Sequence, residues 1–209
     1  MRQKRIIGIY LAAGESKRFG GNKLFSSVGN HHLGSLALIT ALDSQLDKIV
    51  VVTTEKDQLN WVSPELFQNY QERWFHATSI KSTYGQSYSL KCGLQFADKL
   101  GADAVLIVLA DQPFISSEMI NKIIRQYQTS QYPYSFIAAS YAGITRPPIL
   151  ISSEMFTDLY QLQGDKGARY LIQDRMNEGG IIEFTDNMCF FDVDTKEDYK
   201  YLLHKLKLK

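Results

Sequence analysis

The sequence is poor in the residues that staple small domains or bind structural metals. Only two cysteines, Cys92 and Cys189, occur in 209 residues, and they lie far apart. Neither they nor the four histidines show a metal-ligand spacing. Two distant thiols are typical of a reducing compartment rather than of a disulfide framework. We therefore expect unpaired cysteines and no structural zinc site.

The sequence also lacks a charge excess and a long apolar run. Twenty-three basic and 22 acidic side chains leave a net charge of +1, which does not favour a polyanion such as nucleic acid. No segment approaches the roughly 18 apolar residues of a membrane span. The start, MRQKR followed by IIGIYLAAG, imitates a signal peptide, but its apolar run leads into a glycine- and charge-rich segment that is better explained as a functional loop. We expect a cytoplasmic protein without nucleic-acid or membrane partners.

Two widespread nucleotide-binding motifs are absent. The sequence contains no G-x-x-x-x-G-K-[ST] motif, and no G-x-G-x-x-G motif follows its first apolar run. It has no linker or low-complexity tract either, and its content of 44% hydrophobic and 22% charged residues is that of a globular domain. Residues 1–209 are therefore expected to form one domain, in which any nucleotide site has to be of another type.

Apolar runs and helical patterns alternate along the chain. Near-continuous apolar runs are typical of strands that are buried on both faces, and they occupy residues 5–12, 48–54, 104–110 and 135–141, with a further strand at 181–185. Helical spacing of apolar residues predicts helices around residues 90–97, 120–127 and 195–209, and helix starts at Ser63-Pro64-Glu65 and at the two SSEM tetrapeptides, 116–119 and 152–155. This alternation predicts an α/β fold, a mostly parallel sheet flanked by helices.

The segment LAAGESKRFGGNK (11–23) follows the first predicted strand. Its glycines let the backbone approach a ligand closely, and exposed N–H groups at a helix start attract anions. Arg18 and Lys23 add full positive charges. The segment predicts a phosphate-binding loop, with an ordinary strand-to-helix turn and a solvated basic rim as the alternative.

Asp111 ends the apolar run 104–110 and precedes Gln112 and Pro113. Because ligands bind beyond the carboxyl ends of parallel strands, Asp111 is expected to face the loop 11–23. Such a carboxylate is well suited to hold Mg²⁺ against a triphosphate. The alternative is that Asp111 merely starts the turn into the next helix.

The loop also resembles a known family. Its pattern LAAG-x-S-x-R-x-G-x-x-K is similar to the signature loop of the MobA-like nucleotidyltransferases. Four further stretches resemble the molybdenum cofactor cytidylyltransferase branch, which includes xanthine dehydrogenase accessory proteins: GQSYSLKCGL (85–94), LADQP (109–113), LQGDKGARYLI (162–172) and FDVDTKEDY (191–199). The resemblance covers nearly the whole chain and implies a Rossmann-like fold of the nucleotide-diphospho-sugar transferase type. Arg146 and the segment GNHHLG (29–34) depart from the family pattern.

This resemblance implies an activity and a set of site residues. The activity is the Mg²⁺-dependent transfer of CMP from CTP to molybdopterin (molybdenum cofactor), with release of pyrophosphate, for a xanthine dehydrogenase-type apoenzyme. Arg18, Lys23 and Asp111 would be catalytic, and Asp111 and Asp192 would bind the metal. The nucleotide would be bound by Leu11, Ala12, Ala13, Gly14, Ser16, Arg18, Lys23 and Ser89, and the pterin side by Gly164, Asp165 and Arg169.

Two of these assignments depend on a choice between neighbouring residues. Asp192 and Asp194 share a face of an extended segment, so periodicity does not separate them. We expect Asp194, directly before Thr195, to cap the final helix, which leaves Asp192 to reach the metal. For Asp165 and Arg169, an i,i+4 ion pair at the start of a surface helix is the alternative.

Other functions remain open. They are guanylyl transfer to the same cofactor, cytidylyl transfer to a sugar or polyol phosphate, and non-catalytic insertion of the cofactor into a xanthine dehydrogenase-type enzyme. A pure carrier would not need Arg18, Lys23 and Asp111 together, so their joint presence favours an enzyme. Alanine at position 13 of LAAG narrows the space beneath the base, which favours a pyrimidine nucleotide.

Overall fold

The first apolar run forms a central strand, β1 (Ile6–Leu11), in which every residue is buried. In the computed structural model, which describes residues 4–207, β1 pairs in parallel with β4 (Lys48–Thr54) on one side and with β6 (Ala104–Leu109) on the other. The interior residues of all three strands are buried. The prediction of strands buried on both faces is confirmed for these runs.

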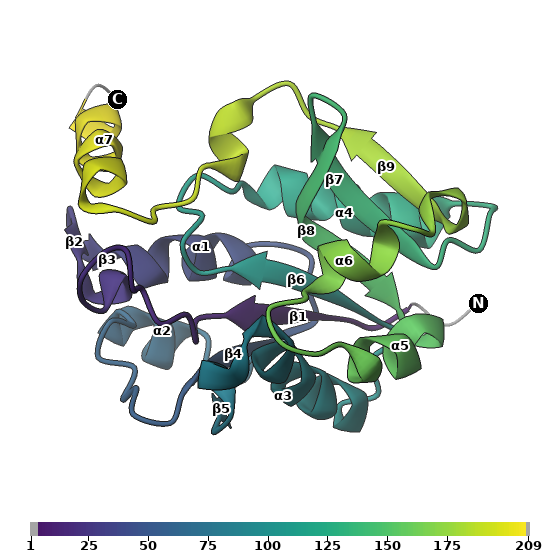
Figure 1. Cartoon of the computed structure of the whole chain (residues 1–209), viewed down its shortest axis with the longest axis horizontal. Helices are drawn as coiled ribbons and strands as arrows, with labels where there is room; N and C mark the ends of the chain where they lie inside the picture. Colours follow the sequence, from purple (N-terminus) through teal and green to yellow (C-terminus); the bar gives the residue numbers. More distant parts are fainter. Residues whose placement is uncertain (1–3, 208–209) are drawn as a thin grey trace.

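Four more strands complete the sheet: β5 (Trp74–Ser79), β7 (Phe136–Tyr141), β8 (Ile144–Ser152) and β9 (Gly179–Glu183). Across residues 4–207 the sheet has seven strands in the order β5-β4-β1-β6-β8-β7-β9 (Figure 1). Strand β8 runs antiparallel to β6 and β7, and the other pairs are parallel. The prediction of a mostly parallel sheet is confirmed.

Strands β5 and β8 were not predicted. Strand β5 lies at the edge of the sheet and has exposed residues, so it lacks a continuous apolar run. Strand β8 contains Pro147 and Pro148, and a proline cannot donate a ladder hydrogen bond. The register of its partner β7 shifts between Ala138 and Ala139, which accommodates this interruption.

Helices cover both faces of the sheet. They are α1 (Leu33–Leu42), α2 (Pro64–Asn69), α3 (Gln86–Lys99), α4 (Ser117–Thr129), α5 (Phe156–Gln161), α6 (Ala168–Ile172) and α7 (Lys196–Lys207). One apolar core packs α1, α2 and α4 against one face, and another packs α3, α5 and α6 against the opposite face. Helix α7 packs on a smaller cluster beside the sheet (Figure 1). None of the helices within residues 4–207 is long and apolar enough to cross a membrane.

Short elements connect these layers. Strands β2 (Ser27–Val28) and β3 (His31–His32) form an antiparallel ribbon. Single 3₁₀ turns occupy η1 (Lys23–Phe25), η2 (Ser82–Tyr84), η3 (Ser153–Met155), η4 (Met176–Glu178) and η5 (Asn187–Phe190). The two SSEM tetrapeptides both precede helices as predicted, but their geometry differs. Ser116 caps α4 by accepting from the Met119 amide at 3.1 Å, whereas Ser152 makes no side-chain cap bond and η3 leads into α5.

The final helix was predicted over residues 195–209, of which 208 and 209 lie outside the described residues. The prediction that Asp194 caps this helix is wrong. Thr195 Oγ1 accepts from the Asp198 amide at 3.1 Å, and Asp198 Oδ2 accepts from the Thr195 amide at 2.8 Å. This reciprocal pair is a capping box. The hydroxyl one position later takes the capping role, so the Asp194 side chain is available elsewhere.

Candidate active site

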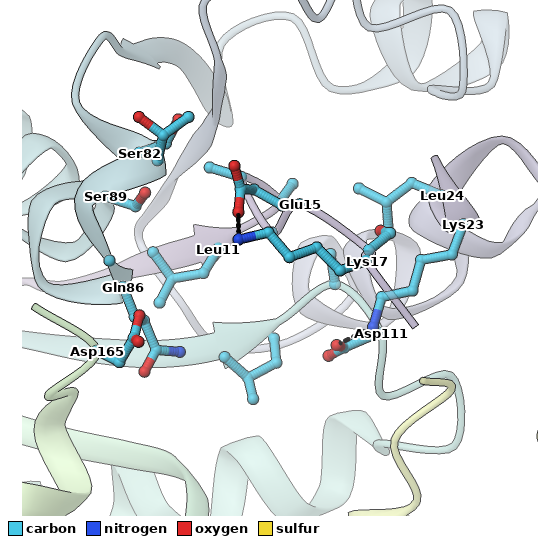
Figure 2. Close-up of a pocket in the computed structure, with 18 of the residues that line it drawn as sticks. Leu11, Glu15, Lys17, Lys23, Leu24, Ser82, Gln86, Ser89, Asp111 and Asp165 are labelled. Atoms are coloured by element: carbon cyan, nitrogen blue, oxygen red, sulfur yellow. Dashed lines mark hydrogen bonds and ion pairs between the residues drawn. The ribbon is translucent and has the colours of Figure 1, made fainter. Parts of the chain in front are cut away.

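The carboxyl ends of β1 and β6 open into a pocket of about 320 Å³. Its walls come from the loop after β1, the turn after β6, and the segment from Ser82 to Ser89 on the opposite side (Figure 2). Leu11, Leu24 and Leu109 give it an apolar lining. The prediction that the loop and the Asp111 turn lie at one edge of the sheet is confirmed.

The loop after β1 presents hydrogen-bond donors that the described residues leave unused. Ser16 adopts a positive φ of 50°, and its carbonyl accepts from the amides of Phe19 and Gly20 at 3.0 and 3.2 Å. The Ser16 hydroxyl is buried, and nothing within residues 4–207 hydrogen-bonds to it. In the same range, the Gly14 and Glu15 amides donate to no backbone carbonyl. These groups can donate hydrogen bonds to phosphate oxygens.

Lys23 is buried between two carboxylates. Its side chain is 8% exposed, and Nζ lies 2.7 Å from Asp111 Oδ2 and 3.0 Å from Asp194 Oδ1. Burial alone lowers the pKa of Lys23, but the Asp111 and Asp194 carboxylates raise that pKa above its usual value. Asn22 fixes the start of η1 by accepting from the Leu24 amide at 3.1 Å. Lys23 is therefore a held, protonated cation at the pocket wall.

Asp192 is a second acid beside Asp111. Its Oδ1 accepts from Gln112 Nε2 at 2.9 Å, and the Val193 amide donates to the Asp111 carbonyl at 3.0 Å. Burial, followed by the charge of Asp111, raises the pKa of Asp192 to about 6, although the Gln112 hydrogen bond lowers it. The chain thus holds two mutually repelling carboxylates close together.

These residues fit a hard divalent cation. Asp111 and Asp192 supply carboxylate oxygens, and a cation between them would relieve the repulsion that raises the Asp192 pKa. Magnesium beside a triphosphate commonly uses one or two carboxylates together with phosphate oxygens. Within residues 4–207, no group of three or more His, Cys, Asp or Glu side chains is arranged to hold a metal ion.

Arg18 lies outside the pocket that Lys23 lines. Its side chain is 73% exposed, and its NH2 group donates to Asp194 Oδ2 at 2.8 Å. It lines a second hollow of about 630 Å³, together with Asp192 and Asp194. Arg18 and Lys23 thus reach Asp194 from two hollows rather than lying together in one phosphate cradle. Asp194 therefore pairs with both cations, and the D-x-D pattern at 192 and 194 was the sequence signal that pointed to it.

The predicted pterin-side residues lie next to the pocket. Asp165 lines it and also lines an adjoining pocket of about 320 Å³ that contains Arg169. Within the described residues no ion pair joins Asp165 to Arg169, so the structure does not show the alternative of a surface i,i+4 pair. The Gly164 carbonyl accepts from the Ser87 amide at 3.0 Å, which ties this loop to the start of α3.

Most of the residues assigned to the nucleotide line the pocket, namely Leu11, Ala12, Ala13, Gly14, Ser16, Lys23 and Ser89, as does Asp111. Gln86 and Lys17 also line it, although neither was assigned to the site from the sequence. Figure 2 shows Lys17 reaching toward Glu15 across the pocket, where the two form an ion pair. Gln86 lies inside the GQSYSL stretch, and Lys17 lies in the loop itself, so both were within segments already identified.

Comparisons with known proteins agree with this geometry. The model of the MobA-like NTP transferase domain matches residues 8–179. The purine catabolism protein PucB of Bacillus subtilis (strain 168) is 38% identical over 202 residues, covering 95% of this chain and 96% of PucB. A probable molybdenum cofactor guanylyltransferase of Natranaerobius thermophilus is 24% identical over 204 residues, covering 92% of each chain.

Solved structures share the fold over the whole chain. A homolog of Mycobacterium tuberculosis Rv0371c from Mycobacterium sp. strain JC1 has a TM-score of 0.77 at 26% identity, covering 100% of both chains. Rv0371C of Mycobacterium tuberculosis H37Rv, in complex with manganese, has a TM-score of 0.69 at 18% identity, covering 97% of this chain and 100% of that one. The family match over most of the chain and the pocket at the edge of the sheet lead to one conclusion. The chain belongs to the MobA-like NTP transferase family and is a nucleotidyltransferase.

Proposed function

We propose that this nucleotidyltransferase moves CMP from CTP to molybdopterin, with Mg²⁺, for a xanthine dehydrogenase-type enzyme of the cytoplasm. The observation that carries the proposal is the contact of Lys23 with Asp111, 2.7 Å apart, opposite the open donors of the loop after β1. The names of two relatives support the acceptor. PucB is named a purine catabolism protein, and xanthine is a purine. The relative from Natranaerobius thermophilus is named for the molybdenum cofactor.

The transfer is a displacement at phosphorus. An oxygen of the acceptor phosphate forms a bond to the α-phosphorus of CTP, while the bond from that phosphorus to the bridging oxygen breaks and pyrophosphate leaves with the electron pair. The second pKa of a phosphate monoester is about 6, so the acceptor is largely deprotonated at neutral pH and needs no general base. The task of the protein is to position the phosphates and to stabilise negative charge.

The residues of this chain divide that task. The Ser16 hydroxyl and the Gly14 and Glu15 amides would bind phosphate oxygens, and the Lys23 ammonium would stabilise the charge that develops on the transferring group. Asp111 and Asp192 would hold Mg²⁺, which supplies further neutralisation of phosphate charge when bound. The manganese complex of a solved relative supports a divalent cation in this fold.

The choice of CTP rests on Ala13. Ala13 is 6% exposed and lines the pocket, where a methyl group would take space that a larger purine base needs. The relative from Natranaerobius thermophilus is named a probable guanylyltransferase, and this keeps GTP as the second candidate nucleotide.

A product assay tests the proposal. The protein is incubated with Mg²⁺, molybdopterin and each of the four labelled triphosphates, and the products are separated and identified. We expect a molybdopterin cytosine dinucleotide and pyrophosphate, and preference for CTP when CTP and GTP compete. Lys23→Ala is the inactive control. A guanine dinucleotide as product would show that the substrate is GTP rather than CTP. Wild-type protein that binds molybdopterin but forms no dinucleotide would favour the insertion factor.

A further inference from the structure

The hollow of about 630 Å³ that contains Arg18 is separate from the nucleotide pocket. Asp192 and Asp194 line it, and Lys23 connects it to that pocket because Nζ contacts both Asp194 and Asp111. The remaining lining is largely aromatic, with Tyr141, Phe190, Phe191 and Tyr201. The two hollows thus meet at the carboxylates where the transferring phosphate would lie.

Arg146 is the unpaired cation of this hollow. Asp194 is taken by Arg18 and Lys23, Asp192 accepts from Gln112, and Asp198 caps α7. No hydrogen bond or ion pair joins the Arg146 guanidinium to any residue between 4 and 207, although three carboxylates line the same hollow. Its Nε is buried without an acceptor. A buried N–H group without an acceptor is unfavourable, so an anionic ligand that accepts from Arg146 Nε would be stabilised here.

The sheet, rather than a loop, holds Arg146 in place. It lies in β8 opposite Ala139 of β7, at the point where the register of this pair shifts. Tyr141, at the end of β7, lines the hollow beside it. Because the strand is paired, the backbone of Arg146 is held in place. The guanidinium N–H donors match the oxygens of a phosphate.

We propose that Arg146 binds the phosphate monoester of the acceptor, which makes this hollow the acceptor site and Arg146 its specificity-determining residue. The inference rests on the proposed function. In-line displacement requires the attacking and leaving oxygens on opposite sides of the α-phosphorus. An acceptor phosphate at Arg146 would approach from the Asp192 and Asp194 side, while the triphosphate occupies the Lys23 pocket. Arg169, which the family resemblance links to the pterin, lies in the other adjoining pocket.

Steady-state kinetics test the assignment. KM for molybdopterin and KM for CTP are measured for wild type, Arg146→Ala and Arg146→Lys, with Arg125→Ala, an exposed arginine of α4, as the matched control. We expect Arg146→Ala to raise KM for molybdopterin at least tenfold and KM for CTP less than twofold, with partial recovery in Arg146→Lys. An unchanged KM for molybdopterin in Arg146→Ala overturns the assignment.

A binding measurement keeps the inference separate from the proposed function. In ¹⁵N NMR spectra, the Arg146 Nε–H resonance, assigned by its loss in Arg146→Lys, is followed while inorganic phosphate is titrated into protein saturated with CMP. A saturable shift supports phosphate binding at Arg146 even if the protein transfers nothing to molybdopterin. No shift overturns the assignment whatever the product assay shows. If Arg146→Ala does not fold, Arg146→Gln replaces it.

Discussion

Lys23 donates to Asp111 and Asp194 at the same time, and each contact serves a different purpose. The contact with Asp111 fixes the ammonium at the nucleotide pocket, and the contact with Asp194 neutralises an acid of the second hollow. Removing Lys23 therefore removes a phosphate-directed charge and leaves Asp111 without its cation, whereas Asp194 keeps Arg18. Arg18 differs because its side chain is mostly exposed, and exposed ion pairs contribute about 0–1 kcal/mol.

We expect Lys23→Ala and Arg18→Ala to separate activity from stability. Both variants should lose turnover, Lys23→Ala by roughly 100-fold or more, the size typical of losing one charge-stabilising donor. Only Lys23→Ala should also lower the melting temperature, because it removes a buried ammonium and leaves Asp111 without its partner. Turnover and thermal unfolding measured on both variants check this. Wild-type turnover in both would show that the loop is structural.

Asp192 gives a prediction on pH. Its pKa is about 6 in the folded protein, compared with about 3.9 for an unfolded aspartate. A raised carboxyl pKa means that the charged form destabilises the fold, fully above about pH 6 and not at all below about pH 4. Without metal, Asp192→Asn should therefore stabilise the protein at pH 7.5 by about 1–3 kcal/mol, and this gain should disappear on acidification to pH 4.

Chemical unfolding across pH 4–8 measures this difference, with the exposed Asp174→Asn as control. Adding Mg²⁺ with CTP should stabilise wild type more than Asp192→Asn and should support turnover only in wild type. A variant with unchanged turnover and Mg²⁺ response would remove Asp192 from the metal site, while leaving the pH prediction to stand on its own.

At the scale of elements, the start of α3 and the loop before α6 are in direct backbone contact. Gly85 has a φ of +124°, and a Cβ there would lie 2.2 Å from the Gly164 carbonyl carbon. Gly143, in the turn between β7 and β8, has a φ of +74° but open space around its Cβ position. Both glycines have a positive φ, which disfavours side chains, but only Gly85 has a neighbour close to its Cβ position.

We expect Gly143→Ala to cost about 1–2 kcal/mol, from backbone strain alone, and Gly85→Ala to cost at least about 3 kcal/mol because the loop must also move. Gly85→Ala should further raise KM for CTP, since Gly85 and Asp165 both line the nucleotide pocket. Urea unfolding and kinetics of the pair decide this. Equal losses of stability would show that the backbone contact is soft.

The elements differ in how well the sequence predicts them. Strands β1, β4 and β6 are buried on both faces, so their apolar runs predict them directly. Edge strand β5 and the proline-containing β8 carry no such signal. Helix α1 is apolar around most of its circumference, with seven of its ten residues buried, and therefore lacks the one-sided spacing by which helices were predicted.

The candidate site was predictable where a contiguous motif carries it. The loop after β1 and the turn at Asp111 were placed correctly because strand ends fix both. The pairing of Asp194 with Lys23 and Arg18 was not predicted. Asp194 lies 171 residues from Lys23 and 176 residues from Arg18 along the chain. Its neighbour Thr195 offered a hydroxyl that caps α7, and local spacing does not tell which of the two neighbours takes that role.

For the whole molecule, one sheet carries the apolar cores on its two faces and the nucleotide pocket at its edge. Buried residues of β1, β4 and β6 contribute alternately to the cores on the two faces. We therefore expect residues 1–209 to unfold in a single cooperative transition, with equal calorimetric and van't Hoff enthalpies. Differential scanning calorimetry measures this, and two resolved transitions would contradict the single domain.

The same experiment tests ligand linkage. CTP and Mg²⁺ at about 100 times the dissociation constant should add roughly 2.7 kcal/mol, which corresponds to roughly 5–10 °C for a chain of this size. Sodium chloride at equal ionic strength serves as the control. A melting temperature unchanged by CTP and Mg²⁺ would argue against nucleotide binding in the pocket of β1 and β6.

The contact between Gly85 and Gly164 also bears on how such proteins can be recombined. The two loops are 79 residues apart in sequence, yet a side chain at Gly85 has no room against the backbone of Gly164. A Cβ at Gly167 would lie 2.4 Å from Oε1 of Gln86, so the Gln86 side chain at the start of α3 would have to move. In a library of chimeras made from related chains, crossovers that separate residues 85–87 from residues 164–167 should be depleted among folded members, so the two loops are inherited as one unit.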